Sequence, residues 1–274
     1  RGLGDVYNRQ DSEYQVVSID QSIPLPDYVF YPNSDTDKTA VEWTVDDLNV
    51  AEVATTTDAN GKVSGTVKAK AAGVAVVKLQ VVGKTEVNAA FRLIVRPTNE
   101  PKNCKADATY NSVSLSWSPV ADANGYTITR KVEGSDTEQT IAHVDGTDTV
   151  SYKDTAAQTG ISYIYHVYAY TKYTNNGQTD YANTDAYASV KATPQLGKAA
   201  MTSVTAEGYS SLTLKWEKVD GATGYIVYRS TDKSKVDTQL TDITNGAVSY
   251  VDAALTAGTT YYLSLIHISE PTRH

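Results

Sequence analysis

The chain has 274 residues, a formal net charge of −8 and a pI near 5.0. This length suffices for two or three domains of roughly 100 residues, each with its own core, and the acidic balance leaves no basic face to bind nucleic acid phosphates. No apolar run reaches the length of about 18 residues that a membrane-spanning helix needs. Thr, Val, Ala and Tyr dominate, as is typical of half-buried strands, so the chain is predicted to be all-β.

Residues 13–97 are predicted to form a first β-sandwich, and residues 1–12 to be a linker or a remnant of an upstream region. Valines alternate with polar residues around Trp43, which is the expected core residue, and Asn60-Gly61 indicates a tight hairpin turn. A glycine, Gly73, then precedes a Val-rich run. This order resembles the bacterial immunoglobulin-like group 2 family, which implies a sandwich typical of bacterial surface proteins, adhesins and large secreted enzymes.

An internal repeat of about 99 residues dominates the rest of the chain. The segment Ser-Leu-Ser-Trp that ends at Trp117 recurs as Thr-Leu-Lys-Trp, which ends at Trp216. The segment Gly-Tyr-Thr-Ile around Tyr126 recurs as Gly-Tyr-Ile-Val around Tyr225. A spacing that is kept across several blocks is typical of tandem domains, which we place at residues 98–194 and 195–262.

The repeated blocks continue with a Gly-x-x-Tyr corner that ends at Tyr163 in the first copy and at Tyr261 in the second. In this order the blocks resemble the fibronectin type III family. The resemblance implies tandem sandwiches without chemistry of their own, in which each corner tyrosine sends its hydroxyl back to the backbone. The predicted core residues are Trp43, Trp117, Tyr126, Tyr163, Trp216, Tyr225 and Tyr261. Prolines at 97, 101 and 194 indicate short, stiff linkers between the sandwiches.

Residues 263–274 resemble the in-frame translation of a DNA sequencing adaptor, and we predict that they are not native to the protein. The repeat requires a different sequence here, since the first copy continues with alternating apolar residues. The last sandwich is therefore expected to be incomplete, with the tail a poor apolar match for a strand position.

Few residues are available for catalysis. Two of the four histidines lie in the tail, which leaves His143 and His166. A catalytic triad, a zinc cluster or a proton shuttle would have almost nothing to draw on, and neither a calcium loop nor a phosphate-binding loop is evident. We expect a non-catalytic chain without cofactor or metal site; a calcium ion at a domain junction stays open. Both histidines are expected to face solvent.

Binding is a stronger possibility, because twenty tyrosines stand against two phenylalanines. Ile164, His166, Tyr168 and Tyr170 share the outward parity of one strand. Such a stripe could stack on a carbohydrate or contact another surface protein. The alternative is that outward tyrosines only pair across strands and stabilise the sheet.

Two functions fit these observations. The first is a spacer of an extracellular or cell-surface bacterial protein, which holds a distant adhesive or anchoring domain. The second is an accessory region of a secreted enzyme that acts on polysaccharide or peptidoglycan, with the catalytic domain elsewhere. Both use the same modules, so the sequence does not separate them, and it leaves the oligomeric state open.

Overall fold

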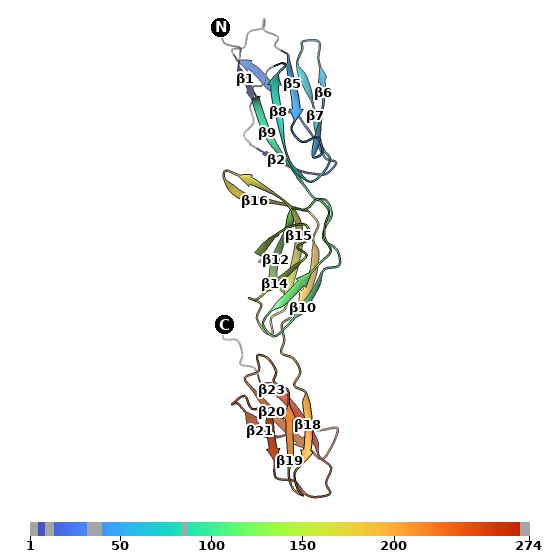
Figure 1. The fold of residues 1–274 in the computed structure, drawn as a ribbon, viewed down its shortest axis with the longest axis vertical. Helices are drawn as coiled ribbons and strands as arrows, with labels where there is room; N and C mark the ends of the chain where they lie inside the picture. The colour runs from blue at the N-terminus through green and yellow to red at the C-terminus, as the bar shows by residue number, and fades with distance from the viewer. Residues whose placement is uncertain (1–4, 9–13, 32–39, 84–86, 269–274) are drawn as a thin grey trace. The chain divides into compact units, whose positions relative to one another are not determined.

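The computed structural model describes residues 5–8, 14–31, 40–83 and 87–268 (Figure 1). The described residues form 23 strands and no helix, so none of them forms a helix that could cross a membrane. The all-β prediction is confirmed. The chain separates into two compact units, one of Arg1–Lys105, Ser116–Tyr152 and Ile164–Val190, and the other of Ala106–Leu115, Lys153–Tyr163 and Lys191–His274.

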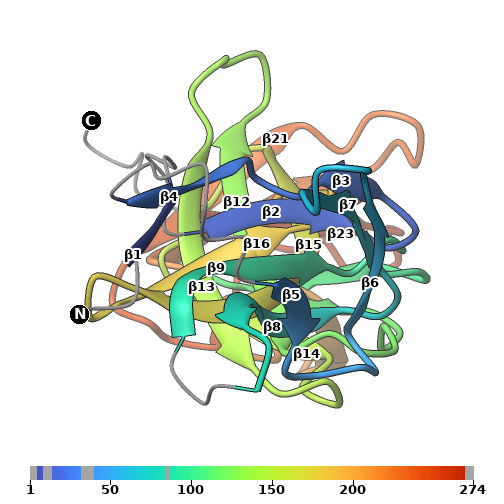
Figure 2. The same ribbon diagram turned by 90° about the horizontal axis from the view of Figure 1, so that it is seen from above.

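The amino-terminal part of the first unit contains a four-stranded sheet and a three-stranded sheet. The larger sheet has the order β2 (Tyr14–Ser18), β9 (Val87–Arg96), β8 (Gly73–Val81) and β5 (Val41–Val45). The smaller sheet has the order β3 (Ser22–Pro24), β7 (Val63–Ala69) and β6 (Ala51–Thr57), and β1 (Asp5–Asn8) pairs with β4 (Tyr28–Tyr31). Strand β2 runs parallel to its neighbour β9, and the two lie side by side in Figure 2.

One hydrophobic cluster fills this amino-terminal sandwich. Trp43 of β5 is buried there and packs edge-on against Phe91 of β9, with 6.5 Å between the ring centroids. The turn between β6 and β7 is closed by Asp58, whose Oδ1 accepts hydrogen bonds from the backbone N–H groups of Asn60 and Lys62, each at 2.8 Å. Gly61 occupies the left-handed region there, at φ +80°.

The rest of the first unit is a five-stranded sheet. Its order is β13 (Gln139–Asp145), β12 (Gly125–Val132), β15 (Tyr163–Asn175) and β16 (Gln178–Asn183), and β17 (Ala188–Ala192) also pairs with β15. Asn176 and Gly177 join β15 to β16 with φ values of 48° and 77°. Two consecutive positive φ values are the mark of a two-residue type I′ turn, which fixes the register of this hairpin.

The arrangement of strands in residues 105–175 recurs once in residues 201–268. A three-stranded sheet has the order β10 (Lys105–Ala108), β11 (Val113–Ser116) and β14 (Ser151–Asp154). Its counterpart later in the chain has the order β18 (Met201–Ala206), β19 (Leu212–Trp216) and β22 (Ser249–Asp252). Likewise the order β13-β12-β15 recurs as β21 (Thr238–Ile243), β20 (Gly224–Ser230) and β23 (Tyr262–Ile268). The sequence repeat is thus a repeat of strand order.

The same pair of aromatic residues lies in each copy. Trp117 packs on Tyr126 and Trp216 packs on Tyr225, each with 5.3 Å between ring centroids. All four side chains are buried. Each tyrosine hydroxyl accepts a hydrogen bond of 2.8 Å, from the N–H of Val120 in the first copy and from the corresponding valine in the second.

Two glycines are required where strands begin. A Cβ on Gly125 would lie 2.2 Å from the carbonyl oxygen of Val144 and 2.5 Å from the hydroxyl of Tyr170. A Cβ on Gly224 would lie 2.5 Å from the carbonyl oxygen of Ile243. Asn124-Gly125 is therefore the entry to β12 rather than a turn, and its glycine is needed for close approach of the neighbouring strand.

The expectation that the carboxy-terminal tail is a poor apolar match is wrong for its first part. Residues 263–268 belong to β23, which pairs with β20 over seven positions. Leu263 and Leu265 pack against the core of this sandwich, while Ile266 points outward and is 48% exposed. The alternation of these side chains fits the strand. Residues 269–274 lie outside the described part of the chain, and the adaptor-like origin stays a prediction.

Replacing Trp117 by alanine should cost about 3 to 5 kcal/mol of unfolding free energy, because it leaves a cavity beside Tyr126. A loss of this size would unfold a domain of ordinary stability, which is about 5 to 15 kcal/mol. Urea denaturation of the full chain, followed by tryptophan fluorescence and circular dichroism, measures it. Trp117→Phe is the control and should lose less. A loss below roughly 1 kcal/mol for the alanine variant would show that this indole does not support the core.

Candidate interaction surface

Strand β15 places the four predicted surface residues on one face of the five-stranded sheet, but not all of them reach solvent. Ile164 and Tyr168 are half-buried, whereas His166 is 7% exposed and Tyr170 is fully buried. The predicted solvent-facing position of His166 is therefore wrong. Its parity is outward, yet side chains from other strands cover it.

His166 lies in a small polar and aromatic cluster. Its Nδ1 lies 2.8 Å from a carboxylate oxygen of Glu138, and that oxygen also accepts a hydrogen bond from the hydroxyl of Thr129. The ring of Tyr187 lies 4.2 Å from the imidazole and 5.0 Å from the ring of Tyr168, centroid to centroid. Burial raises the pKa of Tyr168 to about 12, helped by the nearby charge of Glu138. The phenol is therefore neutral at physiological pH.

Tyr170 belongs to a second cluster on the same face. Its hydroxyl donates to Asp145 Oδ1 at 2.6 Å, and Lys172 Nζ contacts Asp145 Oδ2 at 2.7 Å. The hydrogen bond from Lys172, and to a lesser extent the one from the Tyr170 hydroxyl, lowers the pKa of Asp145 below its usual value. The imidazole of His143 stacks on Tyr181 with 3.7 Å between ring centroids and 5° between planes, and Tyr170 meets the edge of Tyr181 at 4.8 Å.

Hydrogen bonds fix how His143 is protonated. The single proton of the Thr127 hydroxyl goes to Asn183 Oδ1 at 2.7 Å. The Nδ1 of His143, at 3.0 Å from the same hydroxyl oxygen, therefore acts as the donor in this contact. Nε2 is the acceptor of the neutral ring. Burial lowers the pKa of His143, against opposing effects of the Asp145 and Asp180 charges.

The two clusters form an amphipathic face of aromatic rings with hydroxyl, carboxylate and imidazole groups between them. Such a face can stack on an apolar ring and donate or accept hydrogen bonds around it. Tyr187, Tyr181 and Glu138 were not among the residues predicted from the sequence. Asn176-Gly177 could have located Tyr181, because a two-residue turn places it opposite Lys172. Nothing in the sequence indicates that Tyr187, 44% exposed, folds over His166.

The two corner tyrosines lie as the strand pattern requires. The Tyr163 hydroxyl accepts a hydrogen bond from the N–H of Gln158 at 3.2 Å, and the Tyr261 hydroxyl accepts one from the N–H of Thr256 at 3.0 Å. Tyr163 is buried. Tyr261 is only half-buried, and the guanidinium of Arg229 lies 5.2 Å from its ring centre.

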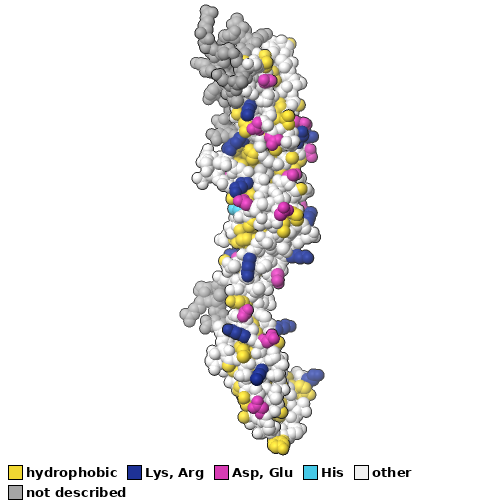
Figure 3. All heavy atoms as spheres, viewed as in Figure 1, with side chains coloured by type: hydrophobic (Ala, Val, Ile, Leu, Met, Phe, Trp, Pro, Cys, Tyr) yellow, Lys and Arg dark blue, Asp and Glu magenta, His cyan; other side chains and the backbone are white. Residues whose placement is uncertain are grey.

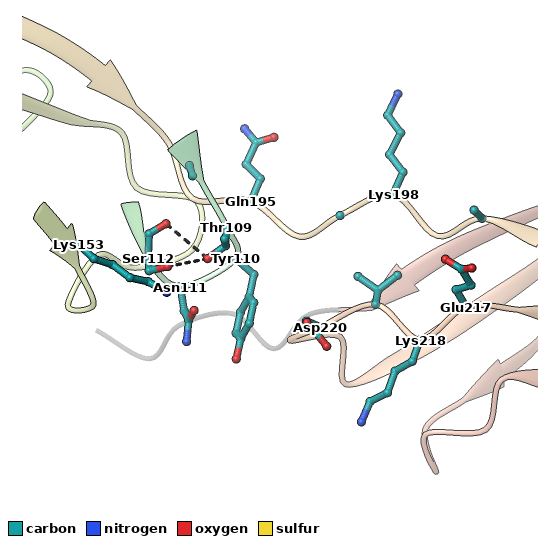
Figure 4. Close-up of a pocket in the computed structure, with 14 residues that line it drawn as sticks. Thr109, Tyr110, Asn111, Ser112, Lys153, Gln195, Lys198, Glu217, Lys218 and Asp220 are labelled. Atoms are coloured by element: carbon teal, nitrogen blue, oxygen red, sulfur yellow. Dashed lines mark hydrogen bonds between the residues drawn. The ribbon is translucent and has the colours of Figure 1, made fainter. Parts of the chain in front are cut away.

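The second unit has a hollow of about 540 Å³ (Figure 4). The loop of residues 109–112 lines this hollow, and a hydrogen bond of 2.8 Å joins the hydroxyls of Thr109 and Ser112. The charged side chains that line it are exposed, and Lys198 and Lys218 point away from each other (Figure 4). Among the described side chains that line the hollow, these two cations do not converge on a common point, so we assign no ligand to it.

The described residues hold no group of three or more His, Cys, Asp or Glu side chains arranged to bind a metal ion. Over the face drawn in Figure 3, Lys and Arg side chains are interspersed with Asp and Glu. The absence of catalysis stays a prediction.

No family model and no curated protein matches the sequence. Among solved structures, a segment of two fibronectin type III domains from chicken tenascin is similar, with 18% identity, a TM-score of 0.37, and coverage of 62% of this chain and 92% of that one. The FN1–FN3 domains of chicken CNTN1 align over 97% of this chain and 93% of theirs, with 14% identity and a TM-score of 0.31. A computationally redesigned β-sandwich protein covers 35% of this chain and 95% of its own, with 18% identity and a TM-score of 0.27.

The fold is defined by the strand order. The chain consists of tandem fibronectin type III-like and immunoglobulin-like sandwiches. The strand order of the two repeats and their tyrosine corners carry this statement. Assignment of the first sandwich to the bacterial group 2 family stays a prediction.

We expect the pKa of His143 to lie below the ordinary histidine value of 6.5. Asp145→Asn should lower the pKa of His143 further, because the carboxylate charge stabilises the imidazolium. Tyr181→Ala should raise it towards the ordinary value, because the stacked ring that excludes water is lost. The imidazole resonances followed by NMR between about pH 4 and 9 measure these shifts. An increase in the Asp145→Asn variant would contradict the assignment.

Proposed function

We propose that the chain is a run of non-catalytic spacer modules from a bacterial extracellular or cell-surface protein, which positions a distant adhesive or anchoring domain. The repeated strand order, with a Trp–Tyr pair in each copy, carries the proposal. Tandem fibronectin type III-like modules are typically structural or interaction domains, and a fold of this kind supplies no chemistry by itself.

A spacer must hold a nearly fixed end-to-end distance through its own folded structure. A sandwich with its own hydrophobic core is stiff. The prolines at 97, 101 and 194 restrict the backbone conformations that the segments between modules can adopt. The proposed surface location rests on the resemblance of the first sandwich to a family that is typical of bacterial surface proteins.

A display experiment tests the spacer. The chain is placed between a bacterial surface anchor and a binding reporter, whose access to a ligand on micrometre beads is measured. A Gly/Ser linker of equal residue number is the control. The folded chain should give more bead capture than the linker, because the linker is a flexible random coil whose end-to-end distance fluctuates widely. The Trp117→Ala and Trp216→Ala double variant should fall to the level of the linker. Equal capture by all three would overturn the proposal.

A second candidate function, an accessory region of a polysaccharide- or peptidoglycan-acting enzyme, is favoured by one observation. The aromatic face of β15 presents Tyr168 and the 44% exposed Tyr187 beside Glu138 and His166. A pyranose has an apolar face that stacks on aromatic rings and hydroxyls that hydrogen-bond to neighbouring polar groups. Carbohydrate is thus the ligand chemistry that we propose for this face; a protein partner is the alternative.

Affinity electrophoresis in gels with soluble glucan, xylan or peptidoglycan fragments tests this second function. Retardation of the chain should be lost in the Tyr168→Ala and Tyr187→Ala double variant. Tyr209→Ala is the matched control, because Tyr209 is 93% exposed and lies in the other unit. The chain alone should hydrolyse none of these polymers and no peptide. Turnover that survives repurification and disappears with a single substitution would contradict the non-catalytic assignment.

A further inference from the structure

Ile94 of β9 is fully buried although it faces away from the core of its own sandwich. Its neighbours Leu93 and Val95 point into that core, whereas Ile94 has the opposite parity and belongs to a separate hydrophobic cluster. Strand alternation would leave this side chain on an outer sheet face. Another element must therefore cover it.

The covering element is the β15–β16 hairpin. Tyr173 of β15 and Ala182 of β16 are buried against Ile94, and the ring of Tyr14 on β2 lies 5.4 Å from that of Tyr173. The Tyr173 hydroxyl donates to Asp180 Oδ2 at 3.1 Å, so the ring is held within its own hairpin. These contacts bury apolar surface from residues far apart in sequence, within one compact unit.

Polar contacts surround this apolar centre. The buried Thr171 hydroxyl donates to the carbonyl oxygen of Val95 at 2.7 Å. On one side Arg96 pairs with Asp185 and also donates to the Ser18 hydroxyl at 3.0 Å. On the other side Arg92 donates to the carbonyl oxygen of Thr174. The arginines share the outward parity of Ile94, so one face of β9 contacts the hairpin and the segment that follows it through both apolar and polar groups.

We propose that the β15–β16 hairpin is a clamp that couples the opening of the amino-terminal sandwich to that of the five-stranded sheet. Both β2 and β16 lie at the edges of their sheets, where amides open first when no neighbour covers them. The clamp holds these two edges together. This coupling concerns only residues 14–190, and it stands whether or not the chain acts as a spacer.

Hydrogen exchange of the full chain, resolved by mass spectrometry, tests the clamp. Tyr173→Ala should raise the exchange rate of the β2 amides by about tenfold, which corresponds to a coupling free energy of about 1.4 kcal/mol. Tyr173→Phe keeps the ring and should restore protection. Tyr181→Ala is the matched control, because it removes the same side chain from the opposite face of the same hairpin. It should leave β2 unchanged.

Coupling is reciprocal, so a change on β9 must appear in the hairpin. Ile94→Ala should raise exchange in β16 while the core beneath β9 keeps its protection, since Ile94 does not face that core. The proposal is overturned if Tyr173→Ala leaves β2 protected, if Ile94→Ala leaves β16 protected, or if Tyr181→Ala exposes β2 as much as Tyr173→Ala does.

Discussion

The contact between a tryptophan and a tyrosine organises both copies of the repeat. The tryptophan directly follows β11 in the first copy and ends β19 in the second, and each tyrosine is the second residue of the next strand. Burying the pair therefore brings strands of two different sheets together. The tyrosine hydroxyl then accepts a backbone N–H, which removes the cost of burying it unpaired. The glycine directly before each tyrosine lets the next strand approach closely. The buried Trp–Tyr pair, the hydrogen bond of the tyrosine hydroxyl and the glycine at the start of the strand therefore act together in each copy.

This local arrangement explains why so much of the fold could be predicted from the sequence. Period-two alternation and a kept spacing identify strands and their copies without any knowledge of distant contacts. The identity of edge and neighbouring strands is less accessible. The parallel pairing of β2 with β9 joins segments whose sequences carry no mark of each other. The tail differed for a related reason: Leu263 and Leu265 satisfy the alternation whatever their origin, because a strand position requires apolar side chains at every second residue and little else.

Parity also predicted one face for Ile164, His166, Tyr168 and Tyr170, but parity alone does not give exposure. Tyr187 and Glu138 come from loops next to other strands and cover His166, and Gly125 makes room for the Tyr170 hydroxyl. Burial on this face depends on which side chains fold back over the sheet. No periodicity in the sequence encodes that choice. The same holds for Ile94, whose outward position was filled by a hairpin from the next sandwich.

The type I′ turn at Asn176-Gly177 sets a rule for how the β15–β16 hairpin can change during evolution. One face of the hairpin carries Tyr173 and Ala182 towards β9, and the other face carries Tyr181 towards His143. Inserting or deleting one residue in each strand would exchange these faces, because side chains alternate with a period of two. Length changes in related chains should therefore accumulate as pairs of residues per strand, each pair lengthening the hairpin by about 7 Å. Single-residue changes should be removed by selection.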